Sequence, residues 1–232
     1  MTERSVSWGG LHNARDLGGL PTGTSTTRHG RIYRTPRLDG LDAQGWTQLL
    51  DAGVRTLVDL RNPHEIEPLV LPDALVRHHR PVEVWEDTDF MGRWSAVLDT
   101  PAYYGAALEA WPDLILGAVR AVADAPPGAV VIHCSAGRDR TGMLTAILLS
   151  LVGVPPDVIV EDYGYAVVAM NDYARAGHGD EAARSEEELR ARLAEVGAQL
   201  RAFLTDLDAA DYLTRHGMSA DTVARVRARL LD

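Results

Sequence analysis

The sequence predicts an α/β fold in which a parallel-rich central sheet is flanked by helices. Short apolar runs rich in β-branched residues alternate along the chain with longer segments of helical periodicity. The most apolar run, 129–132, leads through a glycine-containing turn directly into another apolar segment, 143–149. Strands that alternate with helices favour parallel pairing, which places functional loops at the carboxyl edge of the sheet. The length of 232 residues predicts a single domain over residues 1–232.

The first half of the chain contains most of the predicted strands. Gly53 is expected to end the first helix, and the acidic, aromatic stretch 85–100 is predicted to be irregular. Strands are predicted at 31–35, 54–60 and 75–82, helices at 42–51 and 101–124, and a short turn or helix at 63–67.

The second half is predicted to be helical after the strand at 129–132. Ser185 and Glu188 have the spacing of a capping box, which indicates a helix beginning at residue 186. The stretch 174–181 before it is predicted to be a mobile loop. The helices are predicted at 143–149, 156–173, 186–204, 209–216 and 221–230.

The composition excludes several classes of partner. The formal net charge of −10 makes nucleic acid an unsuitable partner and disfavours docking to anionic membranes. There is no run of 18 apolar residues, so we expect no stable membrane insertion. The first ten residues lack the apolar core of a signal peptide, so we expect a cytoplasmic protein. The oligomeric state is left open.

Neither a metal nor another cofactor is expected. His78 and His79 are neighbours in a predicted strand, and adjacent strand residues point to opposite faces of a sheet. They are therefore poorly placed to bind one metal ion. Cys134 is the only cysteine of the chain, which excludes an internal disulfide.

The segment 133–142, which reads HCSAGRDRTG, is the most informative part of the chain. Cys134 and Arg140 are separated by five residues, in a loop between the end of a predicted strand and the start of a helix. Such a loop can direct backbone N–H groups inward and adds the positive end of the helix dipole. This environment suits a phosphate dianion, and it also suits a thiolate.

The residue types of this segment fit phosphate-ester hydrolysis through a covalent intermediate. Cys134 is the candidate nucleophile, since the helix N-terminus, Arg138 and Arg140 all favour its thiolate. Arg140 is suited to bind two phosphate oxygens and to stabilise the transition state. Thr141 can donate its hydroxyl to the departing thiolate, and His133 is expected to orient the loop. Substrate-binding roles are expected for Ser135, Ala136, Gly137, Arg138, Thr141 and His133.

The segment resembles the phosphate-binding loop of the cysteine-dependent protein tyrosine phosphatase superfamily. It is most similar to a bacterial branch of atypical tyrosine and lipid phosphatases, whose loop usually reads HC-x-x-GKDRTG. Arg138 replaces the lysine of that pattern, in a chain whose 23 basic residues are all arginine. Further similarities to the branch lie at 13–19, 30–35, 58–61 with Glu65, 212–213 and 225–231, with Ala14 in place of a phenylalanine.

The resemblance implies a protein tyrosine phosphatase-like fold with a helical lid and C-terminal helices. It also implies a phosphomonoester hydrolase that acts on phosphotyrosine or phosphoserine proteins or on phosphoinositides. A phosphatase of a small phosphorylated metabolite, such as a sugar or nucleoside phosphate, is the alternative. A phosphate-binding module without turnover fits less well, because Cys134, Arg140 and Thr141 are all present.

Two aspartates fit different patterns for the general acid. Well-known tyrosine phosphatases use the aspartate of a Trp-Pro-Asp loop, and this chain contains Trp111-Pro112-Asp113. That tripeptide lies only 21 residues before Cys134 and has the form of a helix start. Related enzymes of the atypical branch place the acid within the phosphate loop, which favours Asp139. Three further aspartates in the segment before the loop are secondary candidates for the general acid: Asp87, Asp89 and Asp99.

Overall fold

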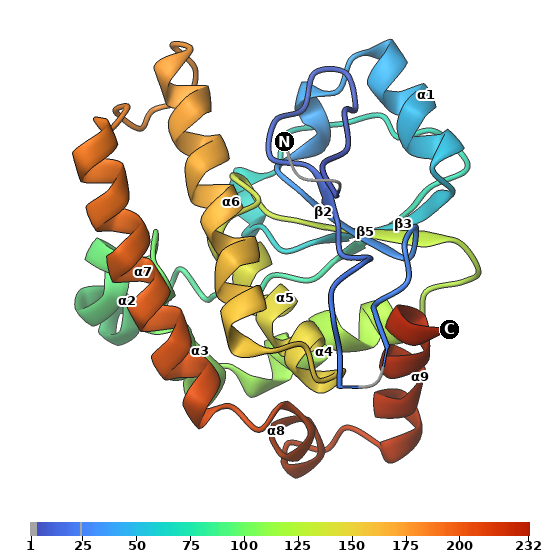
Figure 1. Ribbon diagram of the computed structural model, residues 1–232. Coiled ribbons are helices and arrows are strands. Elements are labelled where there is room, and N and C mark those ends of the chain that lie inside the picture. Colours follow the sequence, from blue (N-terminus) through green and yellow to red (C-terminus); the bar gives the residue numbers. More distant parts are fainter. Residues whose placement is uncertain (1–3, 24) are drawn as a thin grey trace.

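The computed structural model describes residues 4–23 and 25–232, and within them one five-stranded sheet with the order β1-β2-β5-β3-β4. The edge strand β1 is antiparallel to β2, and all other neighbours are parallel. This arrangement confirms the predicted parallel-rich α/β fold (Figure 1). The strands are β1 (Arg15–Asp16), β2 (Ile32–Thr35), β3 (Val54–Asp59), β4 (Val76–His79) and β5 (Ala129–His133).

The register of the three central strands brings their carboxyl ends to one edge. His133 at the end of β5 lies opposite Thr35 at the end of β2 and opposite Asp59 at the end of β3. The loops that follow these strands therefore leave the sheet side by side, as expected for the functional edge of a parallel sheet.

Helices cover both faces of the sheet. The apolar side chains of β5 point alternately to the two faces, so each face needs an apolar layer packed against it. Val130 and Ile132 belong to the larger cluster, with α4 and α5, whereas Ala129 and Val131 belong to the smaller one, with α1. The helices are α1 (Ala43–Asp51), α2 (Thr88–Trp94), α3 (Tyr104–Ala110), α4 (Pro112–Ala123), α5 (Asp139–Leu151), α6 (Pro156–Arg175), α7 (Glu186–Asp206), α8 (Ala209–Arg215) and α9 (Ala220–Leu231).

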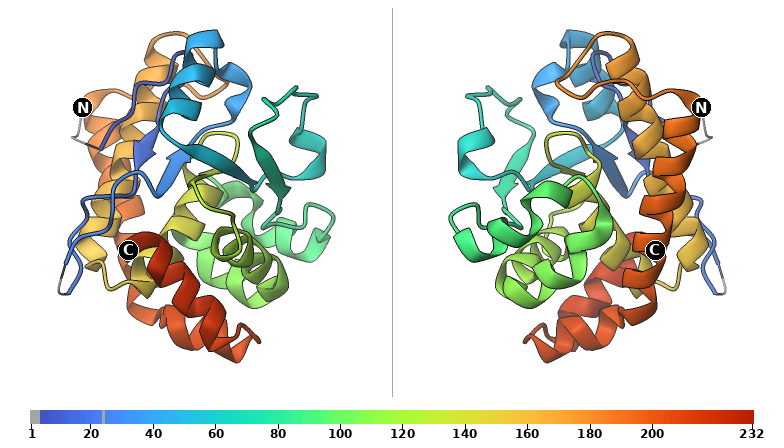
Figure 2. Two further views of the ribbon diagram at one scale, coloured as in Figure 1. Left: turned by 90° about the vertical axis from the view of Figure 1, so that its right-hand side faces the viewer. Right: turned by 90° about the vertical axis from the view of Figure 1, so that its left-hand side faces the viewer.

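The long helices α6 and α7 lie side by side as a hairpin at one flank of the molecule (Figures 1 and 2). Ser185 caps α7 through the predicted capping box with Glu188. Val196 and Leu200 of α7 are buried against the larger cluster, which fixes the hairpin to the domain. In the part of the chain that the structure describes, no helix has both the length and the apolar character needed to cross a membrane.

Two local predictions were wrong in detail. The stretch 85–100 is not irregular, since Asp87 accepts a hydrogen bond from the Phe90 N–H and begins α2, which a 3-10 helix, Ser95–Val97, follows. The predicted helix 101–124 is interrupted at Trp111, because Pro112 begins a new helix there. The segment also begins with a 3-10 helix, Pro101–Tyr103.

Two further differences concern the start of α5 and a strand that was not predicted. Helix α5 begins at Asp139, four residues before its predicted start, so part of the phosphate-loop motif is already helical. The two-residue strand β1 was not predicted, because its residues, Arg15 and Asp16, are charged and its length gives no alternation to detect.

Candidate active site

Cys134 lies in a pocket of about 540 Å³ at the carboxyl edge of the sheet. The pocket is built from the loops after β3, β4 and β5, together with the 3-10 helix after α2. Its lining residues are Asn62, His64, Glu65, Glu83, Trp85, Ser95, Ala96, Leu98, Asp99, Cys134, Ser135, Ala136, Asp139 and Arg140. The sequence-predicted residues Cys134, Arg140 and Asp139 are thus brought together.

The loop between β5 and α5 is held through its carbonyl groups. The carbonyls of residues 135–137 accept hydrogen bonds from the Arg37 N–H, the Asn13 amide and the Arg34 guanidinium, over 2.9, 2.9 and 2.8 Å respectively. No backbone N–H of residues 135–138 donates to an acceptor within 4–23 or 25–232. These N–H groups therefore retain their capacity to bind an anion.

Gly137 is required by the close approach of this loop to β2. Its φ of +67° lies in the left-handed region, and a Cβ atom there would come within 2.4 Å of the Thr35 carbonyl oxygen. The glycine is therefore a structural requirement of the loop, in addition to the substrate contact that the sequence predicts for its backbone.

A buried ion cluster holds the donors that fix the loop. Asp162 of α6 is fully buried and pairs with Arg34, Arg15 and Arg4 at 2.6, 3.3 and 2.8 Å. Arg15 also donates to the Asn13 side chain over 2.5 Å, so both side chains that bind the loop belong to this cluster. Burial opposes ionisation of Asp162, but the three guanidinium groups hold its pKa well below the usual range.

The Cys134 side chain is buried, with 2% of its surface exposed, and forms no disulfide. The Thr141 hydroxyl in the first turn of α5 is also buried, and it has no hydrogen-bond partner among the described residues. An unsatisfied buried hydroxyl is costly. Because it is not engaged by another described residue, the Thr141 hydroxyl remains free to donate the hydrogen bond to the departing Cys134 thiolate that the sequence predicts.

Arg140 is held by two carboxylates of the pocket wall. Both terminal nitrogens of Arg140 donate to the Glu65 carboxylate, and the Nη2 contact measures 2.7 Å. The Nε of Arg140 lies 3.5 Å from the Glu83 carboxylate. Burial opposes the cation, but Glu65, Cys134 and Glu83 together raise the pKa of Arg140. Glu65 takes up two of the five N–H donors of the guanidinium, so further donors remain for a phosphate oxygen.

Glu65 and Glu83 are themselves held in place. Burial raises the pKa of Glu65, but hydrogen bonds from Arg140 and Ser135 lower it to about 2, so Glu65 is an anion at neutral pH. Glu83 accepts a hydrogen bond from Tyr103 over 2.8 Å, and its burial raises its pKa despite the nearby Arg140. In the sequence, Glu65 is noted only as part of a motif similar to the family branch, with no function attached to it. Glu83 belongs to none of the motifs found in the sequence.

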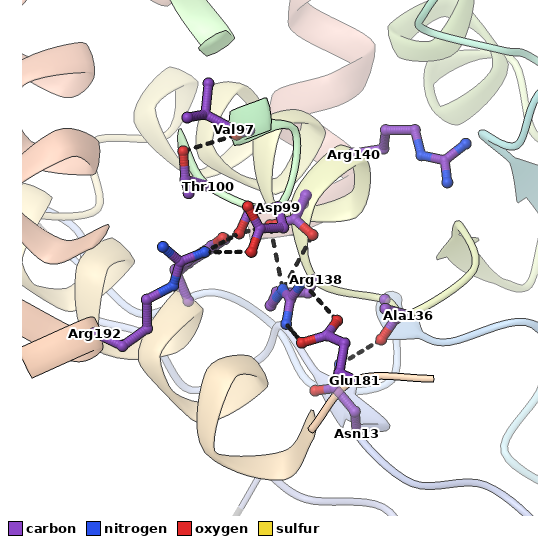
Figure 3. A network of polar contacts seen from close by, with 12 residues as sticks. Asn13, Val97, Asp99, Thr100, Ala136, Arg138, Arg140, Glu181 and Arg192 are labelled. Carbon is purple, nitrogen blue, oxygen red and sulfur yellow. Dashed lines mark hydrogen bonds and ion pairs between the residues drawn. The ribbon is translucent and has the colours of Figure 1, made fainter. Parts of the chain in front are cut away.

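The Asp139 carboxylate lines the pocket, and among the described residues two side chains donate hydrogen bonds to it. Tyr163 donates to its Oδ1 over 2.5 Å, and Arg138 Nε donates to its Oδ2 over 3.0 Å. The two terminal nitrogens of Arg138 donate to Glu181 instead of facing the pocket (Figure 3). The predicted contact between Arg138 and substrate is therefore not visible in this arrangement.

The other candidate acids lie in different surroundings. Asp113 is in the first turn of α4, as the helix-start interpretation predicted, and it lies near Tyr212 of α8. Asp87 and Asp89 line a separate depression beside α2. Of the three secondary candidates Asp87, Asp89 and Asp99, Asp99 alone lines the Cys134 pocket. It forms an ion pair with Arg192 of α7 at 2.5 Å.

His133 is buried and does not line the pocket. Its Nδ1 is 3.2 Å from the Cys134 carbonyl oxygen and its Nε2 is 3.7 Å from Asp59. Burial lowers the pKa of His133 to about 4, so the ring is neutral at pH 7. This position agrees with an orienting role for His133.

Comparisons with known proteins agree with this geometry. The model of the tyrosine phosphatase family matches residues 6–232. A protein from Cupriavidus necator that bears the name of a tyrosine-protein phosphatase is 31% identical over 236 residues, which cover 95% of this chain and 86% of that protein. The triple specificity protein phosphatase PtpB of Mycobacterium tuberculosis is 28% identical over 96% of this chain and 84% of its own length.

A tyrosine-protein phosphatase of Nostoc commune is 28% identical over 86% of this chain and 74% of its own length. The match to the family model covers nearly the whole chain. The chain therefore belongs to the tyrosine phosphatase family, whose members are cysteine-dependent enzymes that hydrolyse phosphomonoesters.

Proposed function

We propose that this phosphatase acts on phosphotyrosine in proteins, through a cysteinyl-phosphate formed on Cys134. The observation that carries the choice of substrate is an aromatic mouth to the pocket. Trp85 lines the pocket with half of its surface exposed, and its ring centroid lies 5.4 Å from that of His64, on the opposing loop. An exposed tryptophan beside a phosphate site is suited to stack on an aryl ring.

The charges of the pocket favour a substrate with one phosphate group. Among the described residues, its lining contains four carboxylates and one guanidinium, that of Arg140. A polyphosphorylated headgroup would bring additional negative charge close to these acidic residues: Glu65, Glu83, Asp99 and Asp139. The pocket therefore fits phosphotyrosine better than a phosphoinositide, and the relatives do not favour the small-metabolite alternative.

The first chemical step transfers the phosphoryl group to the enzyme. The Cys134 thiolate forms a bond to phosphorus as the bond to the tyrosyl oxygen breaks. Asp139 gives its proton to that oxygen, so that tyrosine leaves as the neutral phenol. The loop N–H groups and Arg140 stabilise the equatorial oxygens in the transition state.

The second step releases phosphate. A water molecule attacks the cysteinyl-phosphate, the Asp139 carboxylate accepts the proton of that water, and the bond between sulfur and phosphorus breaks. The Thr141 hydroxyl donates a hydrogen bond to the sulfur as negative charge develops on it. Asp139 is then protonated again and Cys134 is again a thiolate, so the cycle closes without a cofactor.

The proposal is tested by comparing kcat/KM for a phosphotyrosine peptide, a phosphoserine peptide, a phosphoinositide and a sugar phosphate. We expect the phosphotyrosine peptide to have the highest value. Trp85→Ala should raise KM for that peptide about 10-fold. This change corresponds to a loss of about 1.4 kcal/mol, which is near the upper limit for one aromatic stacking contact. Val70→Ala removes an exposed apolar side chain outside the pocket and serves as the control.

A higher kcat/KM for the sugar phosphate or the phosphoinositide would refute the choice of substrate. An equal effect of Trp85→Ala on the phosphoserine peptide would refute the role of the aromatic mouth. The cytoplasmic location and the single domain stay predictions from the sequence.

A further inference from the structure

Glu181 reaches the phosphate loop from a distant part of the chain. It lies in the connection between α6 and α7, 43 residues after Arg138. Its two carboxylate oxygens accept hydrogen bonds from the two terminal nitrogens of Arg138, over 2.9 and 3.0 Å (Figure 3). This parallel, two-pronged contact is the strongest geometry available to a guanidinium and a carboxylate.

Arg138 joins Glu181 to the proposed general acid. Its remaining nitrogen, Nε, donates to Asp139 over 3.0 and 3.3 Å, so each nitrogen of the guanidinium donates to a carboxylate. The Arg138 residue is only 4% exposed and does not line the Cys134 pocket. The guanidinium therefore connects two carboxylates of distant origin, and it is not directed at the position of the substrate.

The charges on this connection matter for proton transfer. Arg138 contacts the Asp139 carboxylate through Nε alone, because Glu181 occupies both of its terminal nitrogens. The position of the guanidinium beside Asp139, and with it the orientation of the carboxylate that transfers the proton, therefore depends on Glu181. Burial raises the pKa of Glu181, but Arg138 lowers it overall, so the group is an anion at neutral pH. Tyr163 also donates a hydrogen bond to the Asp139 carboxylate.

We infer that Glu181 is a positioning residue that acts through Arg138 on Asp139, so that proton donation to the leaving group requires the α6–α7 connection to be docked. The inference rests on the proposed function, since it takes Asp139 as the general acid. It assigns to residue 138 a role in proton transfer, where the sequence predicts a contact with the substrate.

The test compares two substrates that differ in their need for a proton. An alkyl phosphate such as a phosphoserine peptide has a poor leaving group, whereas p-nitrophenyl phosphate expels a stable phenoxide without assistance. Glu181→Gln in the full chain keeps the size of the side chain and removes its charge. Glu187→Gln is the matched control, because it makes the same change at an exposed position of α7.

We expect Glu181→Gln to lower kcat on the phosphoserine peptide about 10-fold, a part of the roughly 100-fold that general acid catalysis supplies. The kcat on p-nitrophenyl phosphate should change little, and Glu187→Gln should leave both substrates unchanged. In an Asp139→Asn background, Glu181→Gln should cause no further loss, because the residue through which it acts is already neutral. Glu181→Asp, which keeps the charge, should restore part of the activity.

Several results would overturn the inference. An equal loss on both substrates would mean that Glu181 merely closes the loop. A lower KM with unchanged kcat would mean that Arg138, once released, binds phosphate. An unchanged enzyme would exclude any role. These outcomes differ from a failure of the proposed function, in which the wild-type protein hydrolyses neither substrate or Asp139→Asn shows no dependence on the leaving group.

Discussion

Arg34 of β2 donates to the carbonyl oxygen of Gly137 over 2.8 Å, through a guanidinium that also pairs with the buried Asp162 of α6 at 2.6 Å. The phosphate loop is therefore shaped by an ion cluster behind it as well as by its own residues. Because a buried charge without a partner is far more costly than a buried pair, this cluster is a site where a single substitution should have a large effect.

Asp162→Asn should destabilise the protein by about 3–5 kcal/mol, because three arginines lose their shared counterion. Urea unfolding measures this change. Asp157→Asn on the same helix is the control, since Asp157 is 81% exposed in its pair with Arg201 and should contribute less than about 1 kcal/mol. A small effect of Asp162→Asn would mean that the arginines are held independently of it.

Arg140→Lys should be nearly as damaging as Arg140→Ala. A lysine cannot bind Glu65 with two nitrogens and also offer donors to two phosphate oxygens, whereas the guanidinium can. We expect both variants to lose transition-state stabilisation on the order of 3 kcal/mol, measured as the ratio of kcat/KM to that of the wild type. Steady-state kinetics with a phosphotyrosine peptide decides the point, and a lysine variant within a few-fold of wild type would show that only the charge matters.

Asp139→Asn should lower kcat by roughly 100-fold or more on a substrate with a poor leaving group, and much less on p-nitrophenyl phosphate. Asp113→Asn is the control, because Asp113 lies in the first turn of α4 and does not line the pocket. It should affect both substrates little. The reverse pattern would assign the acid to the Trp-Pro-Asp tripeptide, and activity of both variants would direct attention to Asp99.

The stability of the protein should fall as the pH drops from about 5 to about 2. Burial raises the pKa of Asp59, but hydrogen bonds from Arg61 lower it to about 2, below the usual aspartate value of 3.8. A depressed acid stabilises the fold above its unfolded pKa and loses that contribution as pH falls through the folded value, here roughly 2 kcal/mol. Glu65 acts in the same direction.

Denaturant unfolding at several pH values measures this loss. The pH dependence should be flatter in Asp59→Asn, which cannot titrate at this position. An unfolding free energy that stays constant between about pH 5 and pH 2 would contradict the assignment of Asp59 and Glu65 as depressed acids.

The core of the fold could be predicted from the sequence because its strands are continuous apolar runs. Val130 and Ile132 are buried on one face and Val131 on the other, as the run at 129–132 implied. The loop motif likewise located Cys134, Asp139 and Arg140 in one pocket. Local spacing was sufficient here, since the loop residues are neighbours in the chain.

The framework of the site could not be predicted in the same way, because it joins residues that lie far apart in the sequence. Arg34 and Asp162 are separated by 128 residues, and Arg138 and Glu181 by 43. A charged residue such as Arg34 within a buried strand was the one available signal of a buried partner. Which of the 33 acidic residues would pair with it depends on the tertiary fold.

The covalent intermediate on Cys134 is the central claim, and it can be trapped directly. Acid quenching of the enzyme during turnover of a phosphorus-labelled phosphotyrosine substrate, followed by peptide mapping, locates the label. We predict one phosphoryl group on the peptide that contains Cys134, absent from Cys134→Ser, which should still bind substrate through the loop N–H groups and Arg140. Label on another residue, or rapid turnover by a folded Cys134→Ser variant, would contradict the account.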